Sequence, residues 1–398
     1  MKHNVKVLVV SLIALTLALS TASLSRAGGW RAIGRQAKRI AGQFISEHKG
    51  SQDTESRTAP SETDALLRKV NEAIDVTRRR RLRADVHSPW QIFHGMLAYG
   101  MSFEIKQGDK LISATKWIAG GVTYDGLPLV EATSDGARFH PYTRPYAFEG
   151  HVNQFLAILA ACDLPRDFKF QAGDREVTID DMIRQAQLEV TANQELTWTL
   201  WSLSHYLDPD AQWTNRYGEV WSLERLVQLC TLDSLSWLPC GGTHRLYAVT
   251  LARNQYLKKH HELHGPWQLA DQWIQYYIEM ARSMQNSDGS FSNNYFDGAG
   301  YTYDVVERLD TSGHTLAWLI LALPDERLQE PWLRRAVEAV ARDLIATSTE
   351  PVECGPLYHA THGLVLYRDR VNAMRNRKSA SSGARPRQVA PDAPHDAG

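Results

Sequence analysis

The stretch SGHTLAWLILAL, from Ser312 to Leu323, places a glycine and a histidine directly before an unbroken apolar run. A second version, LTWTLWSLSHYL, follows the same plan if Thr197 takes the position of the histidine. Helices that are apolar on all sides belong in a protein core. The repetition therefore predicts six buried helices. The other four segments of this kind are FHGMLAYGM at His94, EGHVNQFLAIL at His151, GGTHRLYAVTLA at His244 and YHATHGLVLY at His362.

Six amphipathic helices are expected between these buried ones. Thr178, Pro266 and Pro331 stand near three of their starts, where such residues are favoured. An amphipathic and a buried helix alternating six times predict an all-α fold, an (α/α)6 toroid of six helical hairpins over residues 65–372. The amino termini of the buried helices would then gather at one mouth. The expected amphipathic ranges are 65–83, 109–119, 178–190, 221–232, 267–285 and 329–346.

The composition is globular and its charges are unevenly distributed. The 398 residues are 43% hydrophobic and carry 44 Lys and Arg against 45 Asp and Glu. Residues 86–367 hold 21 basic and 34 acidic groups, a net charge of −13, while the flanks are basic. A nucleic-acid-binding domain needs a basic face, so this body argues against a nucleic-acid partner.

The amino terminus has the pattern of a secretory signal. Lys2 and Lys6 precede an apolar run over residues 7–19, and cleavage fits after Ala27 or after Ala22. The run is shorter than the roughly 20 residues that span a bilayer, although an uncleaved anchor is the alternative. We therefore expect a signal peptide at 1–27, a secreted or periplasmic protein, and no membrane span after cleavage.

Two segments beside the toroid are polar and poor in large apolar residues. Residues 28–64 predict a disordered linker, and residues 373–398 predict a disordered basic tail.

One repeat resembles a known superfamily. The stretch WIQYYIEMARSMQNSDGSF, residues 273–291, followed by SGHTLAWLILAL, resembles the QW-type repeat of the terpenoid cyclase and protein prenyltransferase toroids, with Gln285 and Asp288 at matching positions. YHATHGLVLY resembles the last inner helix of the prenyltransferases. That resemblance implies a zinc-ligand position at His359.

The motifs behind the known activities of these toroids are incomplete. Cyclases use an Asp-x-Asp-Asp motif as their acid, and here Asp180 and Asp181 are not preceded by its first Asp. The prenyltransferase zinc site needs an Asp followed two residues later by a Cys, and Asp297 has no such Cys. Cys240 starts Cys-Gly-Gly-Thr rather than the Cys-Gly-Glu-Gln of thioester toroids. The resemblance therefore implies a fold and leaves the activity open.

The histidines and cysteines predict either a zinc site or structural roles. Near helix amino termini imidazole tends to be neutral, and neutral imidazole is a general base and a metal ligand. Cys240 with His244, and Cys354 with His359 and His362, offer sulfur and nitrogen ligands for zinc. The alternatives are helix-capping histidines and disulfides, with Cys230–Cys240 the most credible pair and Cys162 and Cys354 left over.

Two long loops, residues 124–149 and 292–310, mix aromatic residues with Asp, Asn and Arg. Such loops are often functional, and flat rings beside polar groups suit a glycan or another polyhydroxylated ligand. Alternatively, their polar side chains satisfy the loop backbone. The candidate catalytic residues are His244, His314, Asp310 and Glu149. The candidate ligand-binding residues are Tyr142, Arg144, His151, Trp237, Tyr295, Asp297 and Tyr301. The candidate metal ligands are Cys240, Cys354, His359 and His362, with zinc as the candidate cofactor.

Three functions fit these patterns. The first is an exported enzyme that acts on a glycan-like substrate at the mouth of the toroid. The second is a non-catalytic toroid that binds or scaffolds a ligand. The third is a terpenoid cyclase or prenyltransferase-like enzyme with a diverged site, which predicts a large apolar cavity. The sequence does not decide between an enzyme and a binding protein.

Overall fold

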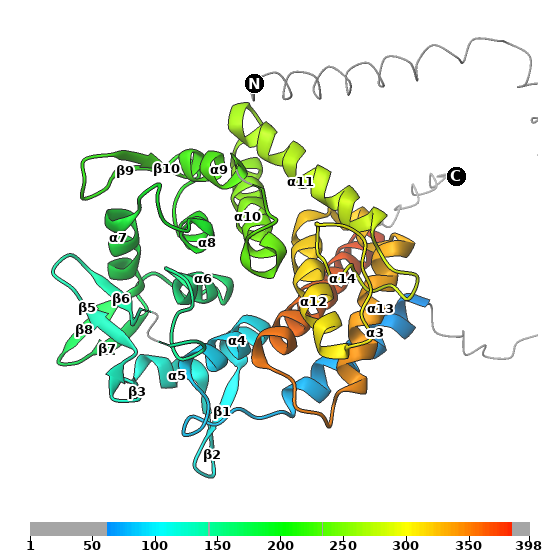
Figure 1. The fold of residues 1–398 in the computed structure, drawn as a ribbon, viewed down its shortest axis with the longest axis horizontal. Coiled ribbons are helices and arrows are strands. Elements are labelled where there is room, and N and C mark those ends of the chain that lie inside the picture. The colour runs from blue at the N-terminus through cyan, green and yellow to red at the C-terminus, as the bar shows by residue number, and fades with distance from the viewer. Residues whose placement is uncertain (1–61, 142–143, 233, 384–398) are drawn as a thin grey trace, which may run out of the picture. The chain divides into compact units, whose positions relative to one another are not determined.

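The computed structural model describes residues 62–141, 144–232 and 234–383 (Figure 1). These residues belong to the second of two compact units, which covers Pro60–Gly398. The predicted signal peptide and residues 28–61 of the predicted linker lie outside the described residues. Helices hold 58% of the described residues, so the predicted helical class is confirmed.

A first series of helices is buried on nearly every side over the predicted apolar segments. Each helix of this series packs against the next, and the last, α14, also packs against the first, α4. Burial of whole helices follows from sequences without a polar face. The members are α4 (Pro89–Tyr99), α6 (Gln154–Ala161), α8 (Thr197–Tyr206), α10 (Thr243–His260), α12 (Val305–Ala322) and α14 (Cys354–Gly383).

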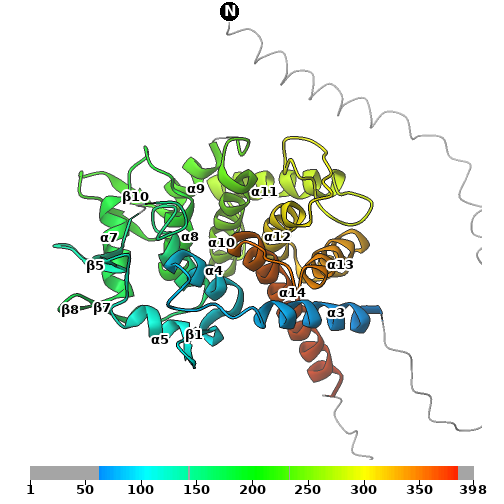
Figure 2. The ribbon, with the colours of Figure 1, turned by 60° about the horizontal axis from the view of Figure 1, so that its bottom comes forward.

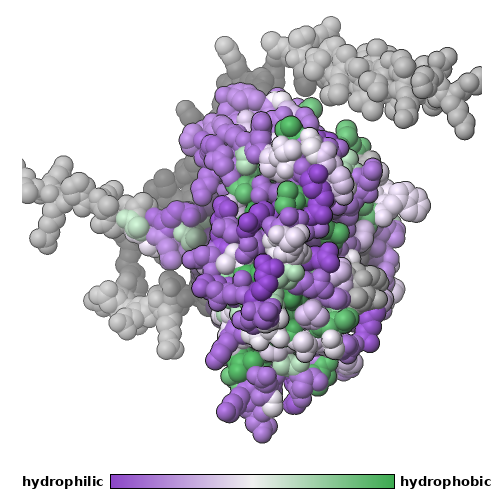
Figure 3. Space-filling view, turned by 90° about the vertical axis from the view of Figure 1, so that its left-hand side faces the viewer, coloured by the Kyte–Doolittle hydropathy of each residue, from purple (hydrophilic) through white to green (hydrophobic). Residues whose placement is uncertain are grey.

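A second series is amphipathic and alternates with the first along the chain. Its helices bury one face and expose the other, as α7 and α13 do. Accordingly, the side of the molecule that carries α7 (Ile179–Glu189) and the hairpins within residues 130–139 and 169–178 is mostly hydrophilic at its surface (Figure 3). The members are α3 (Glu62–Arg78), α5 (Ala114–Ala119), α7 (Ile179–Glu189), α9 (Leu223–Leu232), α11 (Gly265–Ser283) and α13 (Pro331–Ala346).

Short β-hairpins add strands to the predicted all-α fold. In three places an antiparallel hairpin ends directly at the start of an amphipathic helix, so the expected helix over 109–119 begins only at Ala114. Glycines with positive φ, Gly108 and Gly173, make the turns of two of these hairpins. The three hairpins are β1–β2 (Glu104–Gln107, Lys110–Ser113), β7–β8 (Lys169–Ala172, Arg175–Thr178) and β9–β10 (Gln212–Thr214, Val220–Ser222).

Two smaller hairpins lie in the loop expected over residues 124–149. They are β3–β4 (Thr123–Tyr124, Leu127–Pro128) and β5–β6 (Val130–Ala132, Ala137–Phe139).

Several helices start where the sequence places a capping residue. Thr178 accepts a hydrogen bond from the backbone N–H of Asp181, and the Asp181 carboxylate accepts one from the Thr178 backbone. Ser88 and Gln91 form the same reciprocal arrangement at α4. Each pair satisfies backbone groups that a helix end leaves without partners.

The final helix is longer than predicted. The disordered tail was expected from residue 373, yet α14 continues to Gly383 and extends beyond the other helices (Figure 2). Ion pairs hold this extension: Arg375 contacts Asp64 at 2.7 Å, and Arg370 and Arg377 both contact Asp325. Basic residues that looked like a solvated tail thus pair with acids on other segments. None of the helices in the described part of the chain is both long and apolar enough to cross a membrane.

The backbones of helices α12 and α14 come into close contact at Gly313. A Cβ atom added to Gly313 would lie 2.6 Å from Cα and 2.7 Å from the backbone nitrogen of Ala360. Real Cβ contacts of that length do not occur, and backbone atoms cannot turn aside as a side chain can. Glycine is therefore required at this crossing, although it costs helix propensity.

Replacing Gly313 with alanine should destabilise the protein. The added methyl must push α12 and α14 apart, and such overpacking costs about 1–3 kcal/mol. We expect a lower thermal midpoint for Gly313→Ala, measured by circular dichroism. Gly120→Ala is the matched control, because its Cβ would make only ordinary 3.5 Å contacts. A Gly313→Ala midpoint at or above that of the unmodified protein would contradict this account.

Candidate functional site

The amino-terminal halves of several buried helices surround a cavity of about 740 Å³, here called the central cavity. Its most distinctive lining is a set of imidazoles from five parts of the chain, together with one thiol. Carboxylates and two aromatic rings, Trp90 and Tyr146, line other parts of the cavity. The imidazole and thiol groups belong to His94, His151, His244, His314, His359 and Cys240. The carboxylates belong to Asp304, Glu307, Asp310 and Glu353.

A left-handed turn directs Cys240 toward the cavity. Cys240, Gly241 and Gly242 have φ values of 52°, 58° and 72° directly before α10. The left-handed region is unfavourable for a residue with a side chain, so Cys240 carries backbone strain. A Cβ at Gly241 would lie 2.2 Å from the Tyr295 ring, which shows how closely Tyr295 covers the turn. Strain of this kind is often found at functional sites.

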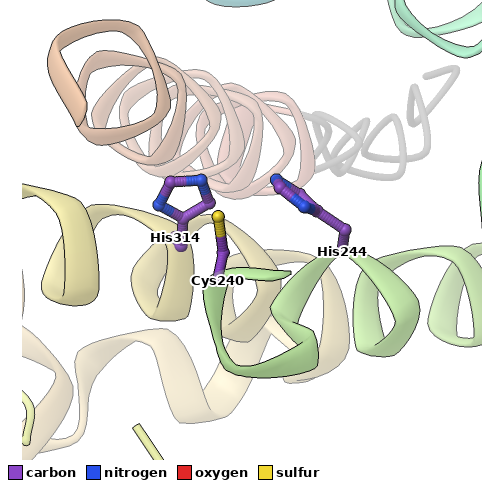
Figure 4. A group of neighbouring side chains, drawn as sticks. All are labelled: Cys240, His244 and His314. Atoms are coloured by element: carbon purple, nitrogen blue, oxygen red, sulfur yellow. The ribbon is translucent and has the colours of Figure 1, made fainter. Parts of the chain in front are cut away.

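Cys240, His244 and His314 form the centre of the cluster (Figure 4). Their sulfur and nitrogen ligand atoms all lie within 4.8 Å of one another. Nε2 of His244 is 3.4 Å from Nε2 of His359, and the rings of His314 and His359 stack with centroids 3.8 Å apart. Groups from α10, α12, α14 and the turn before α10 therefore converge on one point.

Asp310 orients His314. The backbone carbonyl of Asp310 accepts a hydrogen bond of 2.7 Å from Nδ1 of His314, and one carboxylate oxygen lies 3.3 Å from the same nitrogen. A carbonyl only accepts, so Nδ1 carries a proton and Nε2 is left for the cluster. The Tyr295 hydroxyl donates to the other carboxylate oxygen at 3.0 Å.

Burial keeps most of these imidazoles neutral. It lowers the pKa of His94 to about 4, and it lowers the pKa values of His244 and His359 well below the ordinary 6.5 with help from neighbouring histidines. For His314, burial is outweighed by the neighbouring Cys240 sulfur and by Asp310, which raise its pKa to about 9. A cation bound beside Cys240 would take the place of that proton.

His151 belongs to a second arrangement at the cavity. Its Nδ1 lies 2.5 Å from a carboxylate oxygen of Glu195, and its ring stacks on Trp198 at 5.6 Å. The carboxylate accepts a hydrogen bond from the Nδ1–H group, so Nε2 is the ring nitrogen available to a ligand. A histidine oriented by a carboxylate has the arrangement of a general base.

Glu149 lies away from the other candidate catalytic residues. Its carboxylate is buried and accepts a hydrogen bond of 2.7 Å from the Phe155 backbone N–H in the first turn of α6. It lines a neighbouring cavity of about 410 Å³, which shares Gly150 and His151 with the central cavity but is not lined by Asp310. Glu149 and Asp310 therefore do not form one acid–base pair. Burial raises the pKa of Glu149 to about 8.

Glu149 should make stability depend on pH. Its pKa is about 8 in the folded protein against an ordinary 4.5, so the folded state keeps a proton that the unfolded chain releases between those values. Stability from this group is complete below about pH 4.5 and is lost as the pH rises toward 8. Relative to Glu149→Gln, the free energy of unfolding should fall by up to about 1.4 kcal/mol per pH unit in this window.

Denaturant unfolding of both proteins at pH 5, 6, 7 and 8 measures this difference. Glutamine keeps the oxygen that accepts the Phe155 hydrogen bond, so the cap is preserved. Glu224→Gln, at an exposed position, is the control. Its free energy of unfolding should change with pH in the same way as that of the unmodified protein. A Glu149→Gln difference that stays constant across the range would contradict the buried, protonated Glu149.

Several loop candidates do not reach the central cavity. Trp237 is 94% exposed, Tyr301 is 46% exposed beside the Tyr303 ring, and Asp297 is exposed. Arg144 pairs with Asp125 on the surface. These side chains lie on loops whose aromatic and polar content resembled that of a ligand site. Tyr142 lies outside the described residues.

The structure does not bring all four predicted cysteine and histidine ligands to one place. His359 lines the central cavity, whereas Cys354 is buried outside its lining and His362 contacts the Tyr247 hydroxyl at 3.3 Å. Cys240 is a free thiol, so the disulfide expected between Cys230 and Cys240 is not formed. Cys162 and Cys354 are free as well, and the Cys162 thiol donates to the Met96 carbonyl instead.

The predicted site residues did not include Trp90, Tyr146 and Glu195. Trp90 stands four residues before His94, a spacing that puts both on one helix face, so this pairing could have been found. Tyr146 and Glu195 are fixed by tertiary contacts and carry no local signal.

Comparison of the chain with protein-family models, with curated proteins and with solved structures gave no match. Neutral imidazoles and a thiol can hold a soft or borderline metal ion, and His151 can move a proton.

Proposed function

We propose that the two helix series form an (α/α)6 toroid. The packing of each buried helix on the next, with α14 returning to α4, supports a closed ring. The amphipathic helices alternate with this ring along the chain, and α13 packs on α3. This arrangement is the one implied by the resemblance to the terpenoid cyclase and prenyltransferase toroids.

We further propose that the protein is an exported enzyme that acts on a glycan-type substrate in the central cavity. The observation that carries this proposal is the lining of that cavity by imidazoles, a thiol and carboxylates. Trp90 and Tyr146 offer rings on which a sugar can stack, with centroids 4.7 Å apart in an edge-to-face arrangement. The carboxylates disfavour polyanions, so a neutral or amino-bearing sugar fits better than a diphosphate.

In this proposal His151 is the general base. Glu195 holds the imidazole by its Nδ1 proton, and Nε2 takes a proton from water or from a substrate hydroxyl. The resulting imidazolium is stabilised by the Glu195 carboxylate and can return the proton to the leaving group. Hydrolysis of a glycosidic or ester bond is the simplest reaction of this kind.

The two other functions have less support. A cyclase of hydrocarbon substrates calls for an apolar cavity lined mainly by aromatic rings, and most of the lining here is titratable. A non-catalytic binding protein would use the same cavity. It has no need, however, of a histidine oriented by a carboxylate.

Removing the proposed base should abolish turnover while the fold is kept. A panel of neutral and amino-sugar polysaccharides would be tested for binding by tryptophan fluorescence and for cleavage by release of reducing ends. On the substrate found, His151→Ala should lower the rate by about 100-fold or more, and Glu195→Gln should lower it less.

His205→Ala is the matched control for this experiment. His205 also faces a carboxylate, Asp163 at 3.6 Å, but does not line the central cavity. The turnover rate of His205→Ala should equal that of the unmodified protein. Turnover that survives His151→Ala would refute the assignment of the base, and binding without any turnover would favour the scaffold function.

A further inference from the structure

We propose that Cys240, His244 and His314 bind one zinc ion, with a fourth coordination position open to the central cavity. This site goes beyond the proposed function, because the ion can bind whether or not the cavity acts on glycans. Only its use in catalysis rests on that function.

The spacing of the three groups suits the ion. In tetrahedral zinc sites, bond lengths of about 2.0–2.3 Å put neighbouring ligand atoms about 3.3–3.6 Å apart. The ligand atoms here all lie within 4.8 Å of one another, so side-chain movements on the order of 1 Å bring them to bonding distance. One thiolate and two imidazoles are ligands that zinc prefers.

The backbone supplies the three ligands from segments with little freedom to move. His244 is the second residue of α10, and Cys240 is held just before it in the left-handed turn. His314 lies in the middle of α12, one residue after the crossing of Gly313 with Ala360. A preorganised set of ligands lowers the cost of ordering them when the ion binds.

Residues outside the set of three ligands hold His314 in its orientation. Asp310 holds Nδ1 of His314 through its carbonyl and its carboxylate, and the Tyr295 hydroxyl donates to that carboxylate. This leaves Nε2 of His314 for the metal, which is the usual way in which a second layer of residues fixes a metal-bound histidine.

His359 completes the surroundings without belonging to the set. Its Nε2 lies 3.4 Å from Nε2 of His244, and its ring stacks on His314. From there it can accept a hydrogen bond from a water in the open position. Three protein ligands and one open position are typical of catalytic zinc, which lowers the pKa of its bound water to about 7. The set differs from the position at His359 that the family resemblance implied.

Metal analysis tests the site without any substrate. The full chain, exported by its host and purified without chelator, should contain about one zinc per chain after desalting, measured by mass spectrometry. His244→Ala and Cys240→Ser should each lower zinc affinity by more than about 100-fold, and Asp310→Asn by about 10–100-fold. Cys354→Ser and His151→Ala should keep the zinc, so loss of turnover in His151→Ala is separable from loss of metal.

Cobalt provides a second readout that does not require the variants to fold. Cobalt added to the chelator-treated unmodified protein should give a tetrahedral visible spectrum with a thiolate-to-metal charge-transfer band. Absence of zinc and of this spectrum would overturn the site, as would zinc retained in both His244→Ala and Cys240→Ser. A metal-free protein whose Cys240 reacts rapidly with iodoacetamide would instead indicate a nucleophile that uses His314 as its base.

Discussion

The contact between Gly313 and Ala360 joins the packing of the protein to the geometry of its site. Only a residue without a side chain lets α12 come so close to α14. The next residue on α12 is His314 and the previous residue on α14 is His359, and their rings stack at 3.8 Å. The two imidazoles are therefore in contact because the helix backbones are in contact. Cys240 and His244 form a site only because this pair of imidazoles lies beside them.

The electrostatics of the site follow from where it lies in the fold. The body of the protein is acidic, yet His244 and His359 of the central cavity lie against other imidazoles, and burial disfavours their charged forms. Carboxylates such as Glu307 and Glu353 also line the cavity. The cavity thus combines groups that attract cations with neutral groups that can bind them. Glu149, by contrast, lines a neighbouring cavity, where its carboxyl oxygen accepts a hydrogen bond from the Phe155 N–H at the start of α6.

The repeating pattern was enough to predict the helical class, both helix series and a gathering of histidines. It could not predict which groups touch. His314 was expected near the start of its helix, but α12 begins nine residues earlier, where Asp304 accepts hydrogen bonds from the N–H groups of Val306 and Glu307. An Asp followed three residues later by a Glu is a recognisable start signal, so this error was avoidable.

Other differences could not have been avoided. The hairpin strands have only two to four residues, too few for an alternating pattern to stand out. Cys240 and Cys354 are equally plausible ligands from local spacing alone. Only the packing of α10 against α12 brings Cys240 to His314 and leaves Cys354 outside the lining of the cavity.

The turn before α10 has a consequence for evolution. At Gly241 and Gly242 any other residue adds both an unfavourable backbone conformation and a clash, with Tyr295 in one case and with Leu235 in the other. Mutation to any other amino acid at either position is therefore harmful to folding before it affects any chemistry. In descendants of this chain the Cys-Gly-Gly stretch should drift more slowly than the helices around it, since those can exchange one apolar residue for another.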